Sequence, residues 1–316
     1  MRHFTSVNDI PDLKKALEVA FDVKKNPFAY THLGKNKTMV LIFFNSSLRT
    51  RLSTQKAAMN LGMNTMVLNV NEDGWQLESE MGVVMDGNKP EHLREAIPVI
   101  GSYCDIIGVR SFARFESRED DYNEKIINQF IDYAGVPIVS MEAATRHPLQ
   151  SFADLMTIEE LKTKALPKVV LTWAPHPRAL PQAVPNSFVE WMVKAGMELV
   201  VTHPEGYELA PSFMGDLKPE YNQDRAFEGA DFIYAKNWAS YTSYGKILSK
   251  DMNWTVDARK MALTNRAKFM HCLPVRRNMI VTDEVIDSSD SVVIQEAANR
   301  EWSAMAVLKM ILEDNF

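Results

Sequence analysis

Runs of apolar residues alternate with amphipathic stretches along the whole chain. Runs rich in β-branched and aromatic residues predict buried strands: TMVLIFF (38–44), NTMVLNV (64–70), DIIGV (105–109), VPIVSM (136–141), KVVLTW (168–173), MELVVT (197–202), DFIYA (231–235), KFMHCL (268–273) and SVVIQ (291–295). Apolar positions at the helical period predict helices at 51–61, 91–103, 124–134, 152–162, 188–195 and 301–313. Strands that are apolar throughout and are followed by helices are typical of parallel sheets covered on both faces.

The number of predicted strands bears on the domain organisation. Nine strands in 316 residues suit two sheets better than one barrel. The sequence therefore predicts an α/β fold with two doubly wound parallel-sheet domains joined by crossing helices. We expect the first domain at residues 1–145 with a C-terminal helix at 297–316, and the second at 146–296.

Composition and charge narrow the class of protein. Apolar residues make up 46% of the chain and charged residues 24%, the balance of a soluble protein, and no apolar run is long enough to span a bilayer. The first residues, MRHFTSVNDIPDLKK, lack the apolar segment of a secretory signal. The two cysteines, Cys104 and Cys272, stand far apart, which fits a reducing cytoplasm. A net charge of −6 argues against nucleic-acid binding.

In open parallel sheets, ligands bind beyond the carboxyl ends of the strands. The first predicted strand runs into FFNSSLRTR (43–51), where a helix is expected to begin with Ser47 as its N-cap. Free backbone N–H groups, the helix dipole, the hydroxyls of Ser47 and Thr50 and the guanidinium of Arg49 can together bind a phosphate. A capped helix with a solvated basic face is the alternative, and this stretch by itself does not decide between them.

Three further strand ends carry polar side chains. Arg110 follows DIIGV, His147 and Gln150 follow VPIVSM, and Cys272 lies in KFMHCLP. Each has an ordinary structural explanation: a carboxylate partner for Arg110, a hydrogen-bonded histidine, a core thiol. Beside a phosphate site, however, His147 can donate to a carbonyl oxygen. Cys272 has no evident base nearby in sequence, so a core thiol or a polar contact to substrate is favoured over a nucleophile.

Taken together, these segments resemble the aspartate/ornithine carbamoyltransferase family. Three of its motifs occur in order: Ser-x-Arg-Thr-Arg (47–51), His-Pro-x-Gln (147–150) and His-Cys-Leu-Pro (271–274). The strand-terminal Arg110 and Arg300 in QEAANR match as well. The resemblance covers essentially the whole chain, and the Cys-Leu-Pro form is similar to the ornithine enzymes rather than the aspartate enzymes.

One departure from the ornithine enzymes bears on the substrate. In those enzymes an aspartate that holds ornithine stands where this chain has Lys236, in YAKNWASYTSYG. A lysine there would repel the α-ammonium of free ornithine, but it tolerates an acylated, neutral nitrogen. Lys236 and the stretch TWAPHPRALPQAVPNS (172–187) resemble the N-acylornithine branch of the family. In that branch the acetyl-specific enzymes have a glutamate at the position of Pro90, and a proline would not repel a succinyl carboxylate.

The resemblance implies residue roles. It implies catalytic roles for Thr50, Arg110, His147, Gln150 and Cys272. It implies carbamoyl phosphate binding by Ser47, Leu48, Arg49, Thr50, Trp75, Arg110, His147, Gln150, Cys272, Leu273 and Arg300. It implies acylornithine binding by Pro90, Glu142, His176, Arg178, Asn186, Lys236 and Arg276. Transfer of the carbamoyl group to the δ-amine needs no metal and no organic cofactor.

The resemblance also implies an assembly. The segment NVNEDGWQLESEMG (69–82) is similar to a loop that reaches into a neighbouring subunit, with Trp75 as the residue that crosses. A homotrimer with shared active sites is expected, and a satellite core aromatic is the alternative for Trp75. For the second substrate, N-succinylornithine is expected and N-acetylornithine is the alternative. A different class is a non-catalytic sensor of anionic metabolites, against which the carbonyl-polarising residues argue.

Overall fold

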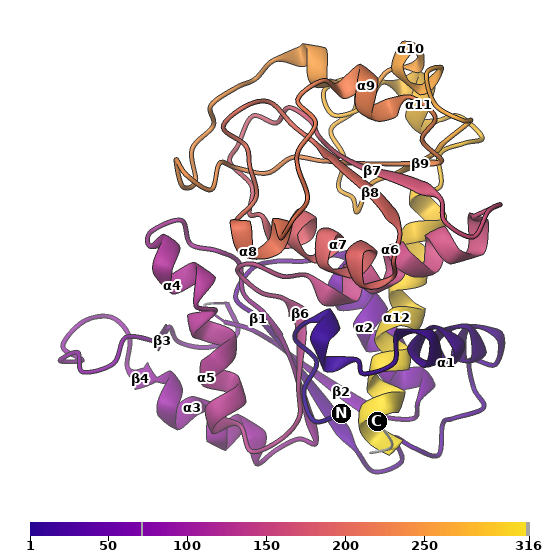
Figure 1. Cartoon of the computed structure of the whole chain (residues 1–316). Helices are drawn as coiled ribbons and strands as arrows, with labels where there is room; N and C mark the ends of the chain where they lie inside the picture. The colour runs from indigo at the N-terminus through magenta and orange to yellow at the C-terminus, as the bar shows by residue number, and fades with distance from the viewer. Residues whose placement is uncertain (71, 314–316) are drawn as a thin grey trace. The chain divides into compact units, whose positions relative to one another are not determined.

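Strands and helices alternate in the computed structural model, which describes residues 1–70 and 72–313 (Figure 1). They form two compact units: residues 1–149 with the segment from Arg300 onward, and residues 150–299. The boundaries predicted after residues 145 and 296 lie a few residues earlier. Each unit contains one four-stranded parallel sheet, as predicted for the α/β class.

The sheet of the first unit has the strand order β2-β1-β5-β6. Its strands are β1 (Thr38–Phe43), β2 (Asn64–Asn69), β5 (Ile106–Arg110) and β6 (Ile138–Glu142). The two central strands and β6 are almost wholly buried, which explains their continuous apolar sequence. Phe43 pairs with Arg110, and Arg110 pairs with Glu142, so the polar ends of these strands lie at one edge of the sheet.

Helices cover both faces of this sheet. Figure 1 shows α3 (Leu93–Gly101) and α5 (Lys125–Tyr133) on one face, with α1 (Leu13–Lys25) and α2 (Arg49–Asn60) on the other. The remaining elements are η1 (Val7–Asp9), α4 (Arg118–Tyr122) and a two-stranded parallel ribbon of β3 (Leu77–Glu78) and β4 (Glu91–His92).

The sheet of the second unit has the order β10-β9-β7-β8. Its strands are β7 (Lys168–Trp173), β8 (Glu198–Thr202), β9 (Phe232–Lys236) and β10 (Lys268–Met270). The helices are α6 (Pro148–Leu161), α7 (Ala183–Lys194), α8 (Pro211–Met214), α9 (Gln223–Phe227), η2 (Met252–Trp254), α10 (Ala258–Met261), α11 (Asp283–Ile286) and α12 (Val293–Glu313). The chain passes from one unit to the other inside α6 and again inside α12.

Three predicted elements differ in the structure. The run 291–295 was expected to be a strand, but α12 begins at Val293 and extends that helix well before the predicted 301. The strand predicted at 268–273 ends at Met270, because Leu273 has a φ of 52°, outside the extended region. The helix predicted from residue 91 begins at Leu93, since Glu91 and His92 pair with the β3 ribbon.

A hydrophobic core stabilises each unit. In the first, side chains such as Ile42, Ile107 and Phe130 form one buried cluster. In the second, Val170, Ile233 and Phe269 belong to another. Within residues 1–70 and 72–313, no helix combines the length and the apolar character that crossing a membrane requires.

Candidate active site

Thr50 is the centre of a hydrogen-bonded cluster in the first unit. Its hydroxyl oxygen accepts from Arg110 Nη1 at 2.8 Å and from Arg300 Nη2 at 2.6 Å. Arg110 Nη1 also donates to Ser47 Oγ at 2.6 Å, and its guanidinium lies 4.5 Å from the ring of Phe112. Thr50 is fully buried, and the two arginines are at most 8% exposed. The cluster therefore gathers two cations and two hydroxyls at the carboxyl ends of β1 and β5.

The start of α2 places the hydroxyls. The helix begins at Arg49, so Leu48 occupies the N-cap position predicted for Ser47. Ser47 still performs the capping interaction, because its hydroxyl accepts from the backbone N–H of Thr50 at 3.2 Å. The first turn of α2 thus presents its N–H groups beside Arg110, which is the arrangement that favours an anion.

Glu142 and His147 complete the cluster of the first unit. Glu142 Oε2 lies 3.3 Å from Arg110 Nη2 and 3.5 Å from His147 Nε2. Arg300 Nη2 is 3.4 Å from the same imidazole nitrogen. We expected Glu142 to contact acylornithine; in this structure it is the last residue of β6 and contacts two residues expected at carbamoyl phosphate. Its carboxylate balances part of the positive charge of the two guanidinium groups.

Gln150 is held by two carboxylates in the second unit. Its amide nitrogen donates to Asp154 Oδ1 at 2.8 Å and to Glu296 Oε1 at 3.3 Å. Within the described residues, its buried Oε1 atom has no hydrogen-bond partner. Buried oxygens without a partner are rare in folded proteins. The amide is thus oriented with its acceptor atom available to a donor from a ligand.

Glu296 also positions the motif around Cys272. Its Oε2 atom accepts from the backbone N–H of His271 at 2.8 Å, and His271 Nδ1 accepts from the N–H of Leu273 at 2.8 Å. Cys272 is 8% exposed. These bonds shape the turn after β10 that carries the carbonyl groups of Cys272 and Leu273.

A second basic group lies at the carboxyl ends of β7 and β9. Arg276 Nε donates to His176 Nε2 at 3.0 Å, so the proton of a neutral imidazole lies on Nδ1, 2.9 Å from the carbonyl oxygen of Arg178. Burial is the main cause of the lowered pKa of His176, and the neighbouring cations Lys236, Arg276 and Arg178 lower it further. The imidazole is therefore uncharged at neutral pH. Lys236 is partly buried, whereas both arginines are exposed.

Trp75, Leu48, Pro90 and Asn186 were also expected to contact the substrates. Trp75 is 61% exposed and donates from Nε1 to Glu91 Oε2 at 2.7 Å, so in the single chain it is not part of a core. Leu48 and Pro90 are exposed, and Asn186 is buried in α7.

Two supporting acids, Asp154 and Glu296, were not singled out from the sequence. Asp154 is one helical turn after Gln150, and Glu296 is one turn before Arg300. That spacing is the sequence pattern from which they could have been found, because residues four apart share a helix face.

Two domains of one known protein family match the sequence of this chain. The aspartate/ornithine carbamoyltransferase carbamoyl-P binding domain matches residues 2–160, and the Asp/Orn binding domain of the same family matches residues 181–311. The chain belongs to the aspartate/ornithine carbamoyltransferase family. It is a carbamoyltransferase, and the predicted family and fold class are confirmed.

Relatives of two kinds cover nearly the whole chain. It is 70% identical to N-succinylornithine carbamoyltransferase of Bacteroides fragilis strain 638R over 316 residues, 99% of each protein. It has the same identity to the protein of that name in Bacteroides thetaiotaomicron, again over 99% of each chain. N-acetylornithine carbamoyltransferase of Xanthomonas campestris pv. campestris is 36% identical over 99% of this chain and 98% of the relative.

Solved structures agree with the fold. Acetylornithine transcarbamylase complexed with acetylcitrulline has a TM-score of 0.90 at 34% identity, covering 98% of this chain and 99% of the other. A glutamate-to-proline variant of N-acetyl-L-ornithine transcarbamylase, complexed with carbamyl phosphate and N-succinyl-L-norvaline, has a TM-score of 0.91 at 35% identity, covering 98% of this chain and 100% of the other.

Proposed function

We propose that this enzyme transfers the carbamoyl group of carbamoyl phosphate to the δ-amine of N2-succinyl-L-ornithine, a step of arginine biosynthesis. The products are N2-succinyl-L-citrulline and phosphate. The observation that carries the proposal is the 70% identity to N-succinylornithine carbamoyltransferases over the full chain, together with the Thr50 cluster.

In this proposal the first unit binds carbamoyl phosphate. The phosphate is bound by the first turn of α2, through the N–H of Leu48, the hydroxyls of Ser47 and Thr50, and Arg49. Arg110, His147 and Thr50 donate to the carbonyl oxygen. Trp75 and Arg300 are the remaining residues that bind carbamoyl phosphate. The support is geometric: two guanidinium groups, two hydroxyls and a helix N-terminus converge in a buried position.

The chemistry is direct attack. The lone pair of the neutral δ-amine forms a C–N bond to the carbonyl carbon, the C–O bond to phosphate breaks, and a phosphate oxygen takes the amine proton. Negative charge grows on the carbonyl oxygen in the transition state, where each preorganised donor contributes roughly 3 kcal/mol. The available Oε1 of Gln150 and the carbonyls of Cys272 and Leu273 are suited to accept from the carbamoyl NH₂. Every step is assigned to protein groups and the two substrates, without a cofactor.

In this proposal the second unit contributes most of the groups for the acylornithine. Lys236, Arg178 and Arg276 supply positive charge for carboxylates, while His176 orients Arg276 through a 3.0 Å hydrogen bond. Asn186, Glu142 and Pro90 are the other proposed contacts. A cation at position 236 disfavours free ornithine, whose α-ammonium would be repelled.

Two observations favour succinyl over acetyl. Identity falls from 70% for the succinyl relatives to 36% for the acetyl relatives. In addition, a glutamate-to-proline variant of the acetyl enzyme was crystallised with N-succinyl-L-norvaline, and this chain has proline at position 90.

The test is Pro90→Glu. The introduced carboxylate would repel the succinyl carboxylate, so the ratio of kcat/KM for N-succinylornithine over that for N-acetylornithine is expected to fall at least tenfold. Exchange of another exposed residue in the same loop, Asn88→Glu, controls for added charge and is expected to move the ratio less. A wild-type preference for N-acetylornithine would overturn the succinyl assignment and leave carbamoyl transfer intact.

We also propose a cytoplasmic homotrimer in which Trp75 enters the site of a neighbouring subunit. Apolar side chains that follow it in sequence support this, since Met81, Val84 and Met85 are 54%, 82% and 43% exposed in the single chain.

A further inference from the structure

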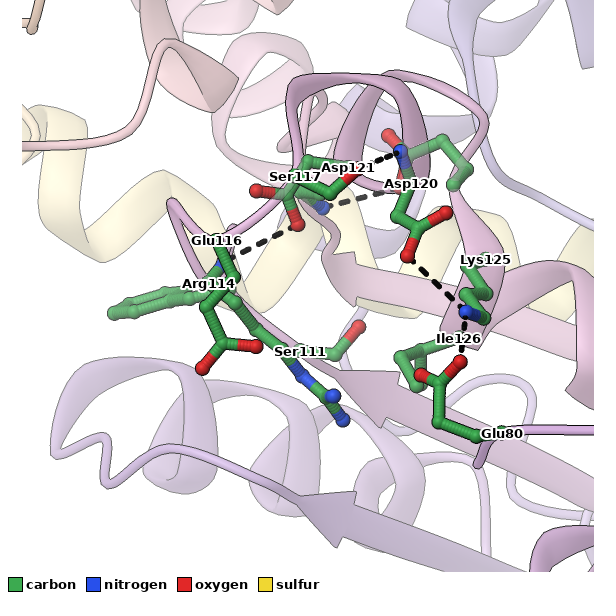
Figure 2. A pocket seen from close by; sticks show the side chains of 12 residues that line it. Glu80, Ser111, Arg114, Glu116, Ser117, Asp120, Asp121, Lys125 and Ile126 are labelled. Atoms are coloured by element: carbon green, nitrogen blue, oxygen red, sulfur yellow. Dashed lines mark hydrogen bonds and ion pairs between the residues drawn. The ribbon is translucent and has the colours of Figure 1, made fainter. Parts of the chain in front are cut away.

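A charged pocket in the first unit is lined mainly by the segment that follows β5. Figure 2 shows Lys125 between Glu80 and Asp120, to which its ammonium donates at 2.6 and 3.1 Å. Asp121, 7% exposed, accepts from the backbone N–H groups of Arg114 and Phe115 at 3.1 and 3.0 Å. The charges of the pocket are thus largely paired with one another and with the backbone, and they fold the segment 111–125 into a fixed shape.

Glu124 extends this segment to the next strand end. It has a φ of 52°, immediately before the first residue of α5, and its side chain makes no capping hydrogen bond to that helix. One carboxylate oxygen accepts from the N–H of Ala144 at 3.1 Å, and the other accepts from the N–H of Thr145 at 2.9 Å and from the Thr145 hydroxyl. Three donors therefore converge on one partly buried carboxylate.

The residues that donate to Glu124 belong to the turn that immediately precedes His147. Ala144 and Thr145 form the turn between β6 and α6, which is closed by a bond from the N–H of Ala143 to the carbonyl of Arg146 at 2.7 Å. Beyond this turn, His147 lies 3.5 Å from Glu142 and 3.4 Å from Arg300. Displacing the turn would move the imidazole relative to both.

We propose that Glu124 is a positioning residue for carbamoyl transfer, which sets the direction of the His147 imidazole by clamping the turn 143–146. The inference rests on the proposed function, in which His147 donates to the carbonyl oxygen. A carboxylate suits the task because both of its oxygens accept, whereas an amide presents one acceptor and one donor. Burial raises the pKa of this carboxyl, while the bonds from Thr145 and Ala144 and the charge of Arg146 oppose that rise.

The test is Glu124→Gln in two backgrounds. In the natural chain, kcat is expected to fall between about 10- and 100-fold, the range that small misplacements of reacting groups produce. KM for carbamoyl phosphate is expected to stay within about threefold, because the phosphate contacts at the start of α2 are untouched. In a His147→Ala background, the same substitution is expected to change kcat less than twofold, since the group it positions is gone.

Matched variants separate positioning from loss of structure. Glu119→Gln makes the same chemical change on an exposed side chain of α4 and is expected to leave kcat unchanged. Thr145→Val removes one donor to Glu124 and is expected to lower kcat, whereas Thr145→Ser keeps the hydroxyl and restores it. These variants serve as the readout if Glu124→Gln does not fold.

Failure of the positioning role and failure of the proposed function would give different results. Equal losses of kcat from Glu124→Gln in both backgrounds, or no loss in either, would overturn the positioning role alone. Absence of citrulline-type product from the unmodified enzyme would overturn the proposed function.

Discussion

The Thr50 hydroxyl illustrates how one small side chain can organise a site. It accepts from two guanidinium groups, at 2.8 and 2.6 Å, and its own proton remains to be donated. Arg110 and Arg300 would repel each other without an acceptor between them, and Glu142 lies 3.3 Å from Arg110. The hydroxyl therefore fixes the relative position of the two charges as well as contributing a donor.

Thr50→Val tests this arrangement, since it keeps the shape and removes the acceptor. Two buried guanidinium groups would each lose a partner, at a cost of about 1–3 kcal/mol in folding free energy. We expect carbamoyl phosphate affinity, measured by calorimetry, to fall at least 100-fold, and Tm to drop. Thr50→Ser keeps the oxygen and should lose less than tenfold. A larger loss in Thr50→Ser than in Thr50→Val would show that the methyl group, not the hydroxyl, matters.

His203 gives the protein a pH dependence of a different origin. It is fully buried, and its Nε2 atom has no hydrogen-bond partner within the described residues. Burial lowers its pKa from 6.5. Because the folded state disfavours the charged form, the stability associated with this residue is complete above pH 6.5 and is lost as pH falls from there toward the lower folded pKa.

We therefore expect Tm to fall between pH 7 and pH 5, and to fall less in His203→Gln. Glutamine approximates the size of the imidazole and does not titrate. Parallel Tm curves for the two proteins across this range would assign the acid sensitivity to other groups, such as His176, whose pKa is also lowered by burial.

At the scale of elements, apolar runs predicted the eight main strands, but they could not distinguish a strand from a buried helix. The run SVVIQ runs into α12, which begins at Val293; Val292 and Val293 are buried, whereas Ile294 is 74% exposed, as helical spacing allows. The carboxyl ends of the predicted strands indicated the positions of candidate site residues such as Thr50, Arg110 and His147. They did not predict Glu124 or Glu296, whose partners are far away in sequence and are set by tertiary packing.

The loop after β9 offers an element-scale prediction. Tyr207 is 1% exposed, and its hydroxyl accepts from the N–H groups of Leu248 and Ser249 at 2.7 and 2.8 Å. These bonds fix Leu248 and Ser249, at the end of the segment that begins after Lys236. Tyr207→Phe should raise KM for the acylornithine about three- to tenfold, since two N–H groups lose their acceptor. Carbamoyl phosphate affinity should not change.

Tyr221→Phe is the matched control, because its hydroxyl donates to Glu208 at an exposed position. A similar rise in KM for both tyrosine variants would mean that the loop is not fastened in particular by Tyr207.

At the scale of the whole molecule, shared sites can be tested by complementation. Trp75→Ala and Arg49→Ala should each be nearly inactive, for different reasons: one lacks the residue supplied to a neighbour, and the other lacks a phosphate ligand. Mixed trimers would contain some sites with both residues intact. We expect activity to reappear after subunit exchange, verified by mass spectrometry of the mixed species. No recovery after verified exchange would contradict the shared site.

The chain crosses between the units in α6 and again in α12, and this connectivity determines which unit is complete first during synthesis. The second unit is one uninterrupted stretch, 150–299, so all of its residues are available to fold once that stretch has been synthesised. The first unit is split, and Arg300, which bonds Thr50, belongs to its later part. A nascent chain that ends before Arg300 therefore contains every residue of the second unit, whereas its Thr50 cluster still lacks the second guanidinium group. The site that begins at the end of β1 is therefore completed by α12, which is synthesised after the whole second unit.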